Sequence, residues 1–175
     1  MTSHQIDLED DAGNDDFDEL YEPIIGPLSL QAITLGTAAV FMVVGILGFL
    51  PGVTSDLSFH NGPRFSGHHS HAMLFGVFMV SVLHNFVHLG YAALGAVSSF
   101  FAQTVRVYFI AGGVIYLVVW LYGLIVREDS SANFLPVNTA DNWLHFGLGV
   151  GMIAIGILLH LRLRAARDRV SPGAQ

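Results

Sequence analysis

Four long apolar runs constrain the fold of this chain more than any other feature. They cover residues 28–50, 71–97, 107–126 and 143–161. Each is long enough to cross the roughly 30 Å hydrocarbon core of a bilayer as a helix, which takes about 20 residues. Because the bilayer core offers the backbone no water, a single spanning segment must be helical to satisfy its own hydrogen bonds. The sequence therefore predicts an all-α fold, a four-helix transmembrane bundle whose main partner is the lipid bilayer.

Charged residues gather at the two ends of the chain. Nine of the 14 acidic residues lie in the first 22 positions, which contain no Lys or Arg. Such a segment repels itself and builds no core, and it is unlike the basic amino end of a signal peptide. The sequence predicts three parts: a disordered acidic N-terminal tail over 1–27, a membrane domain over 28–161 and a basic C-terminal tail over 162–175. It carries no footprint for nucleic acid.

Arginines set the predicted orientation. All seven basic residues are Arg. Cytoplasmic flanks of membrane helices carry the excess of Lys and Arg, so the carboxyl end is predicted to be cytoplasmic. Four spans then place the amino end on the same side and the connections 51–70 and 127–142 outside. The four arginines that follow the last apolar run are Arg162, Arg164, Arg167 and Arg169.

Missing residue types and motifs exclude several classes of protein. Without Cys, the chain has no disulfides, thiolate metal sites or iron–sulfur clusters. Without Lys, it forms no retinal or pyridoxal Schiff base. The sequence also lacks the nucleophile elbow, the P-loop, the dinucleotide fingerprint and the H-E-x-x-H zinc motif. We therefore predict that it is not an enzyme.

Two histidines, His84 and His88, lie one helical turn apart in the second apolar run. A polar group in hydrocarbon costs free energy unless a partner satisfies it, so both are candidate functional residues. At 100° per residue they share one face with Asn85, and this face is predicted to point into the bundle. The third and fourth runs carry further polar side chains on comparable faces: Tyr108, Tyr116, His145 and His160.

Three hypotheses account for these polar groups. In the favoured one they form a structural polar interior without any cofactor. The histidines hydrogen-bond Asn85, Tyr108, Tyr116 or backbone carbonyls, and Asn142 belongs to the same interior. In the second, a b-type haem lies between helices and is bound by His84, His88 and His160. In the third, a divalent metal binds near the outer face to His68, His71, Asp141 and His145.

Helix depth separates these groups into levels. At about 1.5 Å per residue from predicted outer ends at His71 and Trp143, His145 lies about 3 Å deep, and His84 and His88 lie about 20 and 26 Å deep. We therefore predict that His145 belongs to a separate outer cluster. Asp141 or Asn142 directly precedes the fourth run, and one of them is predicted to cap that helix.

Three segments together resemble a known family. They are Gly-His-His-Ser-His-Ala-Met at 67–73, His-Asn-Phe-Val-His-Leu at 84–89 and Val-Asn-Thr-Ala-Asp-Asn-Trp-Leu-His-Phe-Gly at 137–147. In this order the chain is similar to the bacterial integral-membrane proteins grouped as domain-of-unknown-function family 4383, over roughly residues 28–160. The resemblance implies a four-helix membrane domain in the bacterial cytoplasmic membrane and implies no activity. Its signature positions are His84, Asn85, His88, Asp141, Asn142 and His145.

The sequence predicts a small polytopic membrane protein that serves as an accessory or structural subunit, or scaffold, of a larger membrane complex or homo-oligomer. Gly147 and Gly151 form a small-xxx-small pair suited to a partner helix. The alternative is a haem- or metal-binding redox protein that uses its intramembrane histidines. A third hypothesis is a proton or ion conductor, since histidine relays protons near neutral pH.

Overall fold

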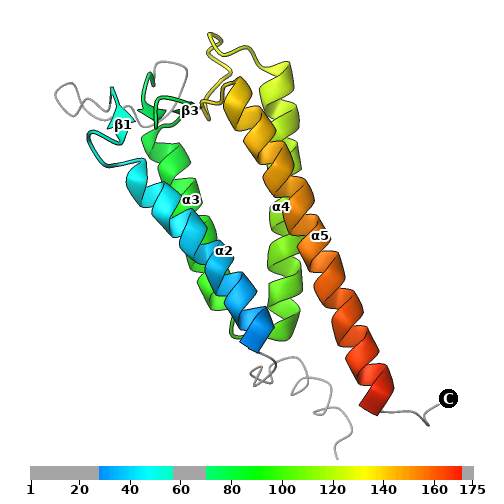
Figure 1. Ribbon diagram of the computed structural model, residues 1–175. Helices are drawn as coiled ribbons and strands as arrows, with labels where there is room; N and C mark the ends of the chain where they lie inside the picture. The colour runs from blue at the N-terminus through cyan, green and yellow to red at the C-terminus, as the bar shows by residue number, and fades with distance from the viewer. Residues whose placement is uncertain (1–27, 57–69, 171–175) are drawn as a thin grey trace, which may run out of the picture.

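The computed structural model describes residues 28–56 and 70–170 (Figure 1). Within them lie four helices and three two-residue strands. The predicted tail over 1–27, His68 and the last five residues lie outside the described residues. The elements are α2 (Leu28–Leu47), β1 (Thr54–Ser55), β2 (Met73–Leu74), β3 (Phe78–Met79), α3 (Val82–Ser98), α4 (Ala102–Ile125) and α5 (Thr139–Val170).

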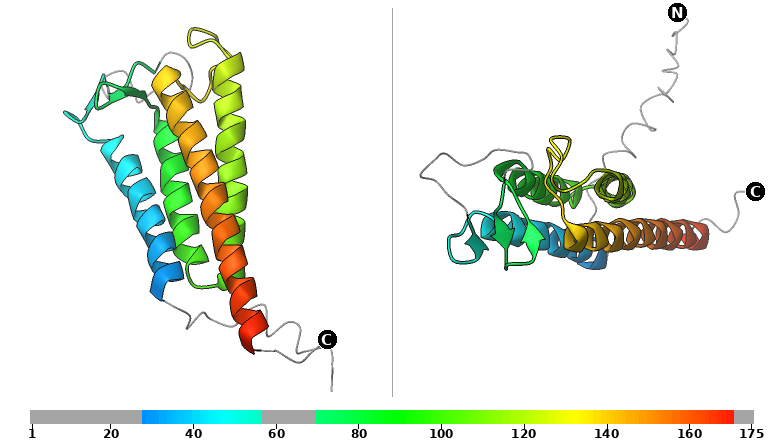
Figure 2. Two further views of the ribbon diagram at one scale, coloured as in Figure 1. Left: turned by 45° about the vertical axis from the view of Figure 1, so that its right-hand side comes forward. Right: turned by 90° about the horizontal axis from the view of Figure 1, so that it is seen from above.

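The helices form two pairs that lean against each other. α2 packs mainly on α3, and α4 packs mainly on α5, with fewer contacts between the pairs. Successive helices run in opposite directions, so the starts of α3 and α5 meet at one end of the bundle (Figures 1 and 2). The small antiparallel sheet, in the order β1-β2-β3, lies at this same end. We call it the hairpin end, and the end at which α5 finishes the opposite end.

Three of the predicted spans are confirmed as long apolar helices. Among the described residues, the helices long and apolar enough to cross a membrane cover Leu30–Leu47, Gln103–Ile125 and Thr139–Arg162. α3 has 17 residues and extends about 25 Å, short of the roughly 20 residues that a span takes. The fold is thus all-helical apart from the short sheet.

The predicted second span, 71–97, is wrong at its amino end. Residues 73–79 form β2, a turn and β3, with Leu74 paired to Phe78, and α3 begins only at Val82. Ser81 fixes that start, because its hydroxyl accepts a hydrogen bond from the backbone N–H of His84 at 3.1 Å. His71 lies just before β2, outside any helix, and its side chain is exposed.

The outer surface of the bundle is apolar on every helix. Large hydrophobic side chains are more than half exposed on all four, as a lipid environment requires. One example from each helix is Val40, Leu94, Val118 and Leu158. The histidines of the candidate site below, His84, His88 and His145, are buried instead.

Candidate metal centre

Three histidines from two helices meet near the hairpin end. His84 and His88 come from α3, and His145 comes from α5. Each offers one ring nitrogen, and these nitrogens all lie within 4.8 Å of one another. None of the three residues is more than 6 % exposed. We call these three residues the histidine cluster.

The positions of the two helix starts place the histidines of the cluster at a similar depth in the bundle. His84 is the third residue of α3 and His145 the seventh residue of α5, so they lie about 3 and 9 Å from the starts of their helices. Both helices start at the hairpin end (Figure 1). The prediction of two separate levels was therefore wrong, because it counted depth from a helix start at His71.

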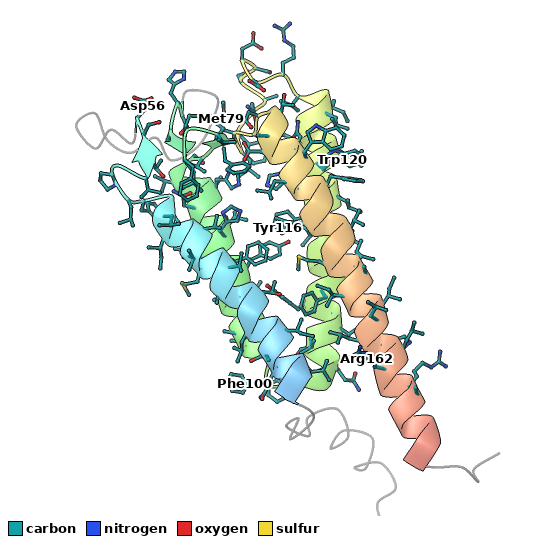
Figure 3. The ribbon with its side chains drawn as sticks, viewed as in Figure 1. Asp56, Met79, Phe100, Tyr116, Trp120 and Arg162 are labelled. Atoms are coloured by element: carbon teal, nitrogen blue, oxygen red, sulfur yellow. The ribbon has the colours of Figure 1, made fainter. Side chains whose placement is uncertain are left out.

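A capping box fixes the start of α5. The side-chain oxygen of Asn138 accepts from the N–H of Asp141 at 3.0 Å, and Asp141 Oδ2 accepts from the N–H of Asn138 at 3.0 Å. Asn138 is thus the cap, in place of the predicted Asp141 or Asn142. Asp141 Oδ2 also accepts from the N–H of Met79 at 2.9 Å, which ties β3 to α5 above the histidine cluster. Figure 3 shows Met79 at the hairpin end.

The four residues predicted as an outer metal site do not come together among the described residues. Asp141 uses its carboxylate on backbone amides, His71 is exposed beside β2, and His145 joins the α3 histidines. His68 lies outside the described residues.

The histidine cluster leaves polar atoms without partners. In the described part of the chain, Nδ1 of His84, of His88 and of His145 is buried and has no hydrogen-bond partner. A buried unpaired polar group costs roughly 1–3 kcal/mol. The same condition holds for the hydroxyls of Tyr108 and Tyr116 and for the side-chain amide of Asn85. The hydrogen bonds predicted from the histidines to these groups are thus not formed at those atoms. Asn142 does link helices, since its Nδ2 donates to the carbonyl of Gly123 on α4 at 2.9 Å.

A small cavity borders the histidine cluster. It has a volume of about 20 Å³, which is enough for one ion or one water. Tyr116 contributes to its wall and stacks on Phe41, with ring centroids 5.7 Å apart. Figure 3 shows Tyr116 between the two helix pairs. The rest of the wall is largely apolar: Val87, Ile115, Val119 and Leu135. A haem does not fit this space.

His160, the predicted haem partner of His88, lies elsewhere. It follows His145 by 15 residues along α5, which is about 22 Å toward the opposite end. Its Nδ1 is 3.0 Å from Nη1 of Arg106. Because His88 stays with His145, the structure does not place His88 and His160 on one haem iron.

Comparison with known proteins gives a family. The model of a domain of unknown function, DUF4383, matches residues 31–158. No curated protein and no solved structure matches the chain. The three histidines of the cluster all lie within the matched range.

Proposed function

Because the chain belongs to the DUF4383 family, whose description gives no activity, we propose a function from the geometry: the protein binds one transition-metal ion in the membrane through the histidine cluster. The single observation that supports this is the convergence of three buried ring nitrogens within 4.8 Å. A cation that accepts a lone pair from each imidazole would offset the cost of burying these three side chains.

Ligand chemistry favours a transition metal such as Zn²⁺ or Cu²⁺ over Ca²⁺ or Mg²⁺. Imidazole nitrogen suits these ions, whereas Ca²⁺ and Mg²⁺ require oxygen ligands, and the cluster offers none. Three histidines match the protein ligands of an open zinc site, in which a fourth position stays available to water or another group. The accessory-subunit and conduction hypotheses stay predictions, because no contact or charge among the described residues tests them.

Metal titration of the full chain tests this proposal. We expect chelator-treated protein in detergent to bind one equivalent of Co²⁺, with visible bands typical of a tetrahedral ion, and Zn²⁺ to displace it. Binding should weaken as the pH falls, because protons compete for imidazole nitrogen and only the neutral ring ligates. Absence of saturable binding of Co²⁺, Zn²⁺ and Cu²⁺ would refute the proposal.

We further propose that α3 completes a four-span topology in a bacterial cytoplasmic membrane, with both termini cytoplasmic and the hairpin end outside. Arg106 near the start of α4 and the arginines late in α5 support this orientation under the positive-inside rule. At the hairpin end, Arg127 is exposed and paired with Asp129.

Because the chain lacks cysteine, single cysteines can report this orientation in intact cells. A membrane-impermeant maleimide should label Asp129→Cys at the hairpin end directly. It should label Gln103→Cys, at the start of α4, only after the membrane is permeabilised. The reverse pattern would overturn the orientation, and labelling of both from outside would contradict the four-span topology.

A further inference from the structure

A groove between α4 and α5 lies at the opposite end of the bundle from the histidine cluster. It has a volume of about 440 Å³. Two polar residues, Arg106 and His160, border it together with Val107, Ile110, Ala111 and Ile157. Arg162, two residues beyond His160, appears on lower α5 in Figure 3. We propose that this groove binds an anionic phospholipid, with its phosphate on Arg106 and an acyl chain along the apolar residues.

The polar part of the groove carries a positive charge that its neighbour does not neutralise. Arg106 Nη1 lies 3.0 Å from His160 Nδ1. A guanidinium only donates hydrogen bonds, so His160 Nδ1 is the acceptor in this contact and supplies no negative charge. The ion pair found among the described residues joins Arg127 to Asp129 at the hairpin end, so it does not involve Arg106. Arg106 therefore keeps its charge and several donors for a phosphate, a group that guanidinium binds with two parallel hydrogen bonds.

The apolar part of the groove continues into the lipid-facing surface. Val107 is 57 % exposed and Ile157 is 48 % exposed, and they lie on the two helices that bound the groove. Arg106 is the fifth residue of α4, about 6 Å from the helix start, a depth at which a long basic side chain reaches the headgroups. A basic group between membrane helices with apolar walls is the setting in which anionic headgroups bind.

A phospholipid suits this groove better than the chain's own acidic segment. Residues 7–22 carry nine acids, which could also pair with Arg106. They contain few apolar side chains to cover Val107 and Ile157, whereas an acyl chain covers both. The combination of one cation and an apolar strip favours the lipid.

Lipid competition on the full chain tests the proposal. Native mass spectrometry of protein in detergent should show phosphatidylglycerol retained about fivefold more than phosphatidylcholine with the same acyl chains, the preference expected of one arginine near a membrane surface. Arg106→Gln should abolish the preference and Arg106→Lys should keep most of it. Arg162→Gln is the matched control, since Arg162 is an exposed arginine at the same end but outside the groove lining; it should leave the preference unchanged.

Several results would overturn this inference. Equal retention of the two lipids by the natural chain would do so even if Arg106→Gln failed to fold. An equal loss of preference in Arg162→Gln would indicate unspecific charge attraction. Displacement of the lipid by inorganic phosphate would reduce the groove to an anion site. Displacement by a peptide of residues 1–27 at equimolar concentration would identify the acidic segment as the occupant.

Discussion

Alanine at His88 or at His145 is expected to lower the affinity for Zn²⁺ and Co²⁺ by at least about 100-fold, beyond the 10–100-fold loss typical of second-shell changes. Each substitution removes one of three ligand nitrogens, and the two that remain do not define a stable site. The visible bands of Co²⁺ should disappear in both variants. Isothermal titration of the purified full-length variants in detergent measures the loss.

Histidines outside the cluster provide the matched controls. His71→Ala and His160→Ala each remove one imidazole at a position that the structure places away from the cluster. Both should keep one equivalent of metal at the natural affinity. If His160→Ala weakened binding as much as His145→Ala, the metal would not sit at the cluster, and unchanged affinity in His145→Ala would refute the site directly.

The variants are expected to remain folded without metal. His88 and His145 each carry a buried Nδ1 without a hydrogen-bond partner in the described chain, so alanine removes a polar group that costs stability. The lost ring volume acts in the opposite direction. A circular dichroism spectrum with unchanged helix content confirms that lost metal binding reflects lost ligands.

The sequence predicted the helices well where one apolar run corresponds to one element. The runs at 28–50, 107–126 and 143–161 became α2, α4 and α5 with ends shifted by a few residues, and by more at the end of α5. The second run contains a hairpin followed directly by a helix, and hydrophobicity alone does not separate the two. Local signals did mark the boundary: Gly76, which adopts φ 68 in the turn, and the capping residue Ser81.

The position of the boundary between hairpin and helix determined how much of the histidine cluster could be predicted from the sequence. The shared face of His84 and His88 follows from helical geometry and needed no tertiary information. Their meeting with His145 depends on the register between α3 and α5. Starting α3 at His71 instead of Val82 shifts it by 11 residues, about 16 Å along the axis. The spacing of Asn138 and Asp141 would have allowed the capping box to be predicted from the sequence. The hydrogen bond from Met79 to Asp141 could not be predicted in this way, because it joins segments 62 residues apart.

Gly113→Ala is expected to destabilise the bundle by about 1–3 kcal/mol, the usual cost of overpacking. A Cβ at Gly113 on α4 would lie 2.7 Å from the carbonyl oxygen of Gly149 and 2.7 Å from Cγ1 of Ile153, both on α5. A backbone carbonyl cannot rotate away, so the two helices must separate. Thermal unfolding in detergent, followed by circular dichroism, should show a midpoint lower by on the order of 5 °C.

Gly147→Ala is the matched control on α5. A Cβ at Gly147 has nothing within 4 Å among the described residues, and alanine favours a helix over glycine by up to about 1 kcal/mol. We expect an unchanged or higher midpoint. Equal destabilisation by both substitutions would mean that another chain packs on the Gly147 and Gly151 face, as the homo-oligomer hypothesis requires. An unchanged midpoint in Gly113→Ala would instead contradict the close contact of α4 with α5, and with it the packing that positions His145 beside α3.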